Sequence, residues 1–214
     1  MATRRSSIAP AVFSLLAAFA LYSEIWRDLS ATGWGDYQEY HHLWEAGRIA
    51  IERFGEWPLW DPFQCGGITQ YGNPQTQVFH PLFYVSLLVG TTIALKLFLT
   101  LHAAAGILGV YVYVRHDEGR SLIASSMSAL TWAGSGYFAW HCGTGHADFI
   151  AFYLTPWILV GWRRSLLDVR WAVLVGVVMS ATVFAGGVYA FPFFVLLIAH
   201  QCAWALADPR RRAA

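Results

Sequence analysis

Long apolar stretches dominate the chain, and one polar segment interrupts them near its amino-terminal end. A membrane-spanning helix needs about 20 predominantly apolar residues. Six stretches approach or reach that length, at residues 8–26, 92–114, 122–140, 149–162, 171–185 and 189–206. The pattern therefore predicts an all-α, polytopic membrane helix bundle of about six spans, formed by a single membrane domain over residues 1–214.

The first apolar stretch has a competing interpretation as a secretory signal. It follows Arg4 and Arg5 and contains the small-residue pattern Ala18-Phe19-Ala20, which resembles a cleavage site. Apolar character continues beyond this pattern to Trp26, which favours a retained membrane anchor. Either interpretation places the segment that follows on the outer side of the membrane.

The polar segment, residues 27–80, is predicted to be a structured first extracytoplasmic loop. Apolar residues between Tyr37 and Phe54 recur at spacings of three and four, which predicts an amphipathic helix on the membrane surface or against the bundle. Proline and glycine then recur up to Pro74, which is typical of a folded irregular loop. Residues 81–89 are apolar but too short to span, so an interfacial or re-entrant helix is predicted there.

Positive charges divide unequally between the two sides of the predicted bundle. One side carries Arg4, Arg5, Arg115, Arg120, Arg163, Arg164, Arg170, Arg210, Arg211 and Arg212. The other side carries only Arg27, Arg48 and Arg53. Because Lys and Arg collect in cytoplasmic loops, both termini are predicted to be cytoplasmic, in a bacterial inner membrane. Residues 27–80 and 141–148 are then the two extracytoplasmic loops.

Composition agrees with a membrane protein and argues against other classes. Of the 214 residues, 57% are hydrophobic and 13% are charged, whereas a soluble domain carries about 25% charged residues. The net charge is +1, and no basic cluster indicates a nucleic-acid partner. The three cysteines form no CxxC pair, which argues against a zinc site and a disulfide framework. Cys65 and Cys142 both fall in outer loops and could pair.

Asp36 is the candidate central residue of the outer loops. It follows the first span closely, so its carboxylate would lie near the outer lipid headgroups. There it could take a proton from an attacking hydroxyl, or help to hold a divalent cation on a phosphate. Asp36 and Glu39 also have the pattern of a helix-capping pair, and one aspartate could serve both roles.

Other ionisable residues have paired interpretations as well. His146 and Asp148, with His141, could form a His–Asp site facing the first loop, or could be ordinary loop polarity. Lys96 lies one turn into its predicted span. It could bind the phosphate of a lipid-linked substrate, or extend its ammonium group to the headgroups.

The outer-loop motifs resemble those of a known membrane-protein family. An aspartate after the first span and an amphipathic helix precede Glu56-Trp57-Pro58-Leu59-Trp60-Asp61-Pro62-Phe63, Gly66-Gly67, Asn73-Pro74-Gln75-Thr76 and His80-Pro81-Leu82. Residues 129–138, Gly145-His146 and Gly186-Gly187 continue the pattern. This order resembles the YfhO-like proteins of the GT-C superfamily of integral-membrane glycosyltransferases, from Asp36 to Gly187.

The resemblance implies glycosyl transfer on the outer face, from a polyprenyl-phosphate-linked sugar and with inversion at the sugar carbon. Asp36 would be the general base on the acceptor hydroxyl. Asp148, which matches only in lying in the second outer loop, would be a weaker second acid. The residues themselves, rather than the resemblance, make Glu39 and His146 candidates for further acid or acceptor contacts and Lys96 a candidate for the donor-phosphate contact. GT-C enzymes are usually far longer, so the chain resembles only their amino-terminal module. The alternative is a non-catalytic truncated relative, a lipid-linked sugar carrier, or a subunit that works with a second membrane subunit.

Overall fold

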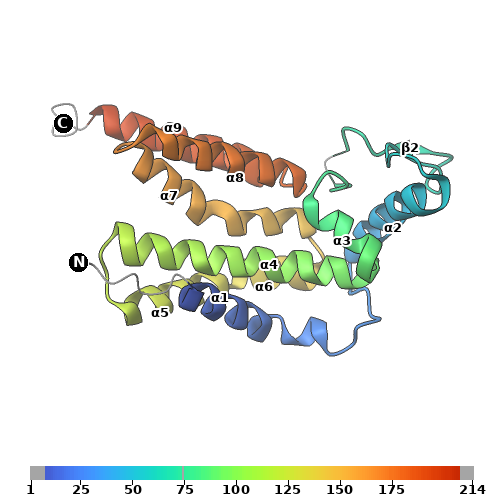
Figure 1. Cartoon of the computed structure of the whole chain (residues 1–214), viewed down its shortest axis with the longest axis horizontal. Coiled ribbons are helices and arrows are strands. Elements are labelled where there is room, and N and C mark those ends of the chain that lie inside the picture. Colours follow the sequence, from blue (N-terminus) through green and yellow to red (C-terminus); the bar gives the residue numbers. More distant parts are fainter. Residues whose placement is uncertain (1–7, 74, 208–214) are drawn as a thin grey trace.

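The computed structural model describes residues 8–73 and 75–207, and this part of the chain is mostly helical (Figure 1). The helices are α1 (Ile8–Leu21), α2 (Tyr37–Phe54), α3 (Pro81–Val89), α4 (Thr91–Val112), α5 (Leu122–Ala133), α6 (Gly136–Thr144), α7 (Thr155–Ser165), α8 (Ala172–Phe184) and α9 (Ala190–Ala207). Short 3-10 segments are η1 (Ser23–Trp26), η3 (Ala147–Leu154) and η4 (Val169–Trp171), and the π-helical η2 (Tyr113–Asp117) extends α4. Strands β1 (Trp60–Asp61) and β2 (Ile68–Thr69) pair antiparallel.

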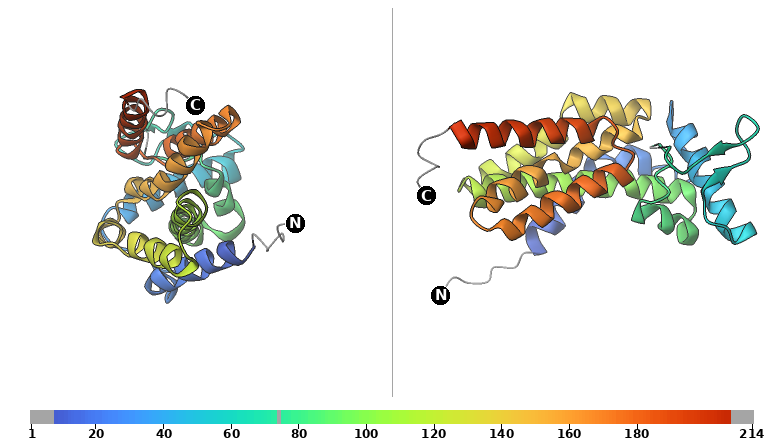
Figure 2. Two further views of the ribbon diagram at one scale, coloured as in Figure 1. Left: turned by 90° about the vertical axis from the view of Figure 1, so that its left-hand side faces the viewer. Right: turned by 90° about the horizontal axis from the view of Figure 1, so that it is seen from above.

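Helix α4 is the centre of the bundle. It packs against α1, α3, α5, α7 and η3, and it lies near the middle when the bundle is viewed end-on (Figure 2). Small residues on α4 permit this packing. A Cβ atom on Gly106 would lie 2.6 Å from the ring of Tyr153, and one on Gly109 would lie 2.9 Å from the indole nitrogen of Trp157. These glycines therefore let η3 and α7 approach the α4 backbone closely.

Two of the described helical segments are long and apolar enough to cross a membrane. They are Thr91–Asp117, which is α4 with η2, and Ala190–Ala207, which is α9. Both fall where spans are predicted. The apolar segments Ile8–Leu21 and Val169–Phe184 are shorter. Helices α1 and α9 respectively begin and end at the same end of the bundle (Figure 1). Arg4, Arg5 and Arg210–Arg212 lie outside the described residues.

Two predicted spans are interrupted rather than continuous. The stretch 122–140 divides between α5 and α6, because the chain leaves the helix at Gly134 and Ser135 has extended dihedral angles. The stretch 149–162 divides between η3 and α7. Pro156 lies in the first turn of α7, where its missing N–H costs no helical hydrogen bond. Pro156, which lies inside the apolar stretch 149–162, is thus at the start of a helix rather than in its interior.

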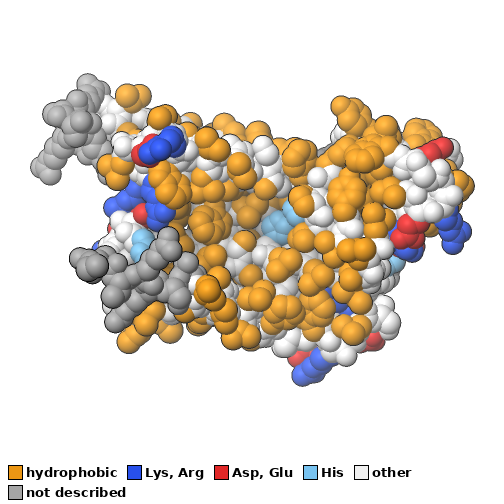
Figure 3. All heavy atoms as spheres, viewed as in Figure 1, with side chains coloured by type: hydrophobic (Ala, Val, Ile, Leu, Met, Phe, Trp, Pro, Cys, Tyr) orange, Lys and Arg blue, Asp and Glu red, His pale blue; other side chains and the backbone are white. Residues whose placement is uncertain are grey.

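The surface separates charged from uncharged regions along the long axis. Figure 3 shows Lys, Arg, Asp and Glu side chains gathered at the two ends, with a largely hydrophobic band between them on this face. Helix α9 contributes exposed large apolar residues, among them Phe193, Leu196 and Trp204. Such a band is the surface expected of helices that contact lipid.

The polar segment 27–80 folds around its predicted amphipathic helix. Helix α2 occupies Tyr37–Phe54, the predicted range, and it packs on α3 and α4. Trp44 is fully buried, and its indole nitrogen donates a 3.1 Å hydrogen bond to Gln77. The amide nitrogen of Gln77 in turn donates to the carbonyl of Ala185 at 2.8 Å. These bonds attach the loop to the end of α8.

The irregular part of the loop is held by a buried carboxylate. Asp61 is fully buried in the two-stranded segment and accepts hydrogen bonds from the backbone of Phe63 and from Nε2 of His42, each at 2.8 Å. Because His42 belongs to α2, this pair ties the hairpin to the helix. Proline and glycine thus mark a folded loop here, as predicted.

Candidate functional site

Asp36 lies at the start of α2 with its carboxylate free of any capping bond. It occupies the N-cap position, but its side chain makes no cap hydrogen bond. Glu39 is turned elsewhere and accepts a 3.0 Å hydrogen bond from the amide of Gln64. The predicted Asp36–Glu39 capping pair is therefore wrong. The Asp36 side chain is 64% exposed and available for other contacts.

The segments 27–80 and 141–148 meet beside Asp36 through their backbones. The N–H of Asp36 donates a 3.2 Å hydrogen bond to the carbonyl of Thr144 at the end of α6. Gly35 and Gly145 flank this bond with φ of +62° and +89°. A Cβ on Gly35 would lie 2.1 Å from the Thr144 oxygen, and one on Gly145 would lie 2.6 Å from the Asp36 nitrogen. Only glycine permits this close approach.

The contact brings two histidines to Asp36. Nε2 of His146 lies 3.6 Å from Oδ2 of Asp36, slightly beyond hydrogen-bond distance. Nδ1 of His146 lies 2.9 Å from Nδ1 of His141, so the two rings share a hydrogen bond. The His141 ring stacks on Phe149, with centroids 3.9 Å apart and planes within 7°. Packing thus fixes a His141–His146–Asp36 series.

Asp148 is the buried acid of the site. It is 5% exposed. Burial raises the pKa of Asp148, and the nearby Tyr40 hydroxyl, the backbone N–H groups around it and the neighbouring His146 oppose the shift. The same environment raises the pKa of Tyr40. Asp36 and Asp148 therefore differ sharply in environment, one open to solvent and one enclosed, with His146 near both.

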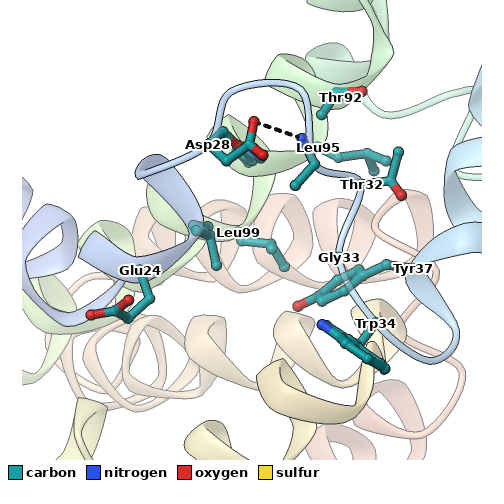
Figure 4. Close-up of a pocket in the computed structure, with 12 residues that line it drawn as sticks. Glu24, Asp28, Thr32, Gly33, Trp34, Tyr37, Thr92, Leu95 and Leu99 are labelled. Carbon is teal, nitrogen blue, oxygen red and sulfur yellow. Dashed lines mark hydrogen bonds between the residues drawn. The ribbon is translucent and has the colours of Figure 1, made fainter.

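A cavity of about 330 Å³ lies beside the segment that precedes α2 (Figure 4). Its walls come from η1, from the loop up to α2 and from the first turns of α4, and they include Glu24, Asp28, Trp34, Tyr37, Thr92 and Lys96. The Lys96 side chain is almost fully buried, and Nζ donates a hydrogen bond to the backbone carbonyl of Asp28. The ammonium group therefore lines a cavity next to the Asp36 segment.

The structure gives no ready-made metal centre in the part of the chain that it describes. No group of three or more His, Cys, Asp or Glu side chains there could hold a metal ion. Cys65 and Cys142 are free thiols, so the pairing that their positions in the sequence would allow is not formed. Cys142 instead accepts a hydrogen bond from the Tyr37 hydroxyl at 3.4 Å. It is thus part of the packing between α2 and α6.

The sequence predicts most members of this group, but it does not predict which side chains contact one another. Asp36, His146 and Asp148 come together, whereas Glu39 does not join them. Tyr40 was assigned to the apolar face of its helix, although its position four residues after Asp36 places it on the same side as that residue. No protein-family model, curated protein or solved structure matches this chain.

Proposed function

We propose that the chain is a membrane glycosyltransferase, or the amino-terminal part of one. It would move a sugar from a polyprenyl-phosphate donor to an acceptor hydroxyl on the outer face of the membrane. The observation that carries the proposal is the position of Asp36. Its exposed carboxylate lies beside His146, where the segments 27–80 and 141–148 meet, and its chain neighbours Trp34 and Tyr37 line the cavity that contains Lys96.

The proposed topology has six spans and cytoplasmic termini. Its support is the pair of long apolar helices, the uncharged band, and the position of the arginine-rich turns. The turns after α4 and α7 carry Arg115, Arg120, Arg163, Arg164 and Arg170, and they lie at the end of the bundle opposite α2 (Figure 1). This arrangement follows the positive-inside rule. It would place Asp36 at the outer boundary, within reach of a lipid-borne phosphate.

The chemistry needs a base on one side of the sugar carbon and an anion site on the other. Asp36 would take the proton of the acceptor hydroxyl as that oxygen forms a bond to the anomeric carbon. The bond from this carbon to the lipid phosphate would break, and the phosphate would keep the electron pair. Lys96, with its charge in the neighbouring cavity, would stabilise the leaving phosphate. The result is inversion at the sugar carbon.

Replacement of Asp36 by Asn tests the proposal directly. The substitution removes the base but should leave α2 intact, because the side chain makes no capping bond. In liposomes that contain radiolabelled polyprenyl-phosphate hexoses, we expect transfer to fall by about 10²–10⁴, the usual contribution of a general base. Glu56→Gln is the matched control, because Glu56 is an exposed acid of the same loop. It should transfer normally.

Lys96→Met gives a second arm that addresses the donor. We expect a higher KM for the lipid-linked sugar with the same acceptor dependence, because only the phosphate contact is lost. Transfer at the normal rate by the Asp36→Asn protein would refute the base assignment. That result would favour the carrier or subunit alternative.

A further inference from the structure

The contact between the two histidine rings restricts where their protons lie. The Nδ1 atoms of His141 and His146 are 2.9 Å apart. One imidazole must donate across this contact and the other must accept, since two N–H groups or two lone pairs would repel each other. The remaining nitrogen of His146, Nε2, faces the Asp36 carboxylate at 3.6 Å. These two contacts together determine the tautomer.

A neutral His146 carries a single ring proton. On Nδ1, that proton would leave the Nε2 lone pair facing an ionised carboxylate, which is repulsive. On Nε2, it points at Asp36, and the Nδ1 lone pair is free to accept from His141. We propose that His141 is a positioning residue that holds His146 as the Nε2–H tautomer, through which His146 orients the Asp36 carboxylate.

His141 is suited to this role because packing fixes its ring. One face stacks on Phe149, and Tyr137 contacts the ring at 4.6 Å in an edge arrangement. Phe149 in turn stacks on Tyr189, with centroids 4.5 Å apart. His141 therefore presents Nδ1 to His146 in a fixed direction. A freely rotating side chain would give no such preference.

The surrounding groups keep this donor neutral. The titratable groups that face the histidine pair from the described residues are Asp36, just before α2, Tyr137 of α6 and Asp148 of η3. Burial lowers the pKa of His141, the adjacent His146 lowers it further, and Asp148 opposes the shift. The shared Nδ1 contact can survive one added proton on the pair but not two, because two imidazolium ions would both need to donate.

The tautomer assignment stands by itself, but its role in catalysis rests on the proposed function. An Nε2–H group 3.6 Å from Oδ2 of Asp36 would attract that oxygen electrostatically, without a formed hydrogen bond, and would leave Oδ1 to accept the proton of the acceptor hydroxyl. His141 would then act on the reaction only through His146. It would contact neither the sugar nor the phosphate.

Imidazole ¹⁵N NMR of protein labelled on histidine tests the tautomer without any substrate. His141→Phe retains a ring to stack on Phe149 and removes the donor, whereas His141→Asn retains an N–H donor. We expect Nε2–H on His146 in the unaltered protein and in His141→Asn. In His141→Phe the ratio of tautomers should shift by about two- to tenfold, the range for one ordinary hydrogen bond. If His141→Phe does not fold, His141→Tyr replaces it.

Two results would overturn the proposal: His146 protonated on Nδ1 in the unaltered protein, or an unchanged tautomer ratio once the donor is removed. The pH profile of transfer adds a readout that a structural role would not move. His141→Phe should change the shape of that profile, whereas simple loss of packing would lower the rate equally at every pH. Because the NMR needs no donor sugar, normal transfer by Asp36→Asn would refute the function and leave the tautomer assignment standing.

Discussion

Gly145→Ala should both destabilise the protein and disturb the candidate site. At φ of +89°, an alanine costs roughly 1–2 kcal/mol relative to glycine. Its Cβ would also lie within 2.6–2.7 Å of three backbone atoms, the nitrogens of Asp36 and Tyr37 and the oxygen of Trp34. Because backbone atoms cannot rotate away, the loops must separate. We expect the 3.2 Å bond from Asp36 to Thr144 to be lost.

The magnitude follows from these two costs. A lost hydrogen bond adds about 0.5–1.5 kcal/mol, so the free energy of unfolding should fall by about 1.5–3.5 kcal/mol in total. For a chain of this size, each kcal/mol corresponds to roughly 2–4 °C in Tm. Thermal unfolding in detergent, followed by tryptophan fluorescence, should therefore show Tm lower by about 3–14 °C. Transfer activity should fall too, because Asp36 and His146 move apart.

Gly143→Ala is the matched control two residues away. Gly143 lies in α6, and a Cβ there would meet no atom within 4 Å. Alanine in a helix is favoured over glycine by about 1 kcal/mol, so this variant should melt at the same temperature or slightly higher. If Gly145→Ala and Gly143→Ala had the same Tm, the backbone contact between Asp36 and Thr144 would be refuted.

Two further variants test the folded segment 27–80. His42→Ala leaves the buried Asp61 carboxylate with only the Phe63 N–H as a partner. The hairpin should therefore lose about 3 kcal/mol of local stability, and chymotrypsin should cut it faster. An unchanged cleavage rate would contradict this prediction. Burial lowers the pKa of His80 from 6.5 to about 3. As the pH falls from 6.5 towards 3, the unfolded chain therefore binds a proton at His80 that the folded chain does not bind, and the free energy of unfolding decreases. At pH 5 the decrease is about 2 kcal/mol. His80→Asn keeps the side-chain cap on the Leu82 N–H and should flatten this loss in urea unfolding; a slope like that of the unaltered protein would show that another group is responsible.

Local pattern determined the helices whose signals are contained within a few turns. The bounds of α2 follow from apolar residues spaced to form one face, and Pro81 and Gly90 delimit α3. The two long apolar helices follow from length and composition alone. In each case the information is local, because backbone hydrogen bonds within a helix join residues only four apart.

Tertiary structure alone decided the interruption at Gly134 and Ser135 and the grouping of Asp36 with His146 and Asp148. Asp36 and His146 are about 110 positions apart in the sequence, and they meet because the backbones at Gly35 and Gly145 can approach within contact distance. No periodic sequence pattern predicts such an approach. The protonation of His146 is also beyond the sequence. It depends on which atoms face each ring nitrogen, and packing from α2, α6 and η3 sets those neighbours.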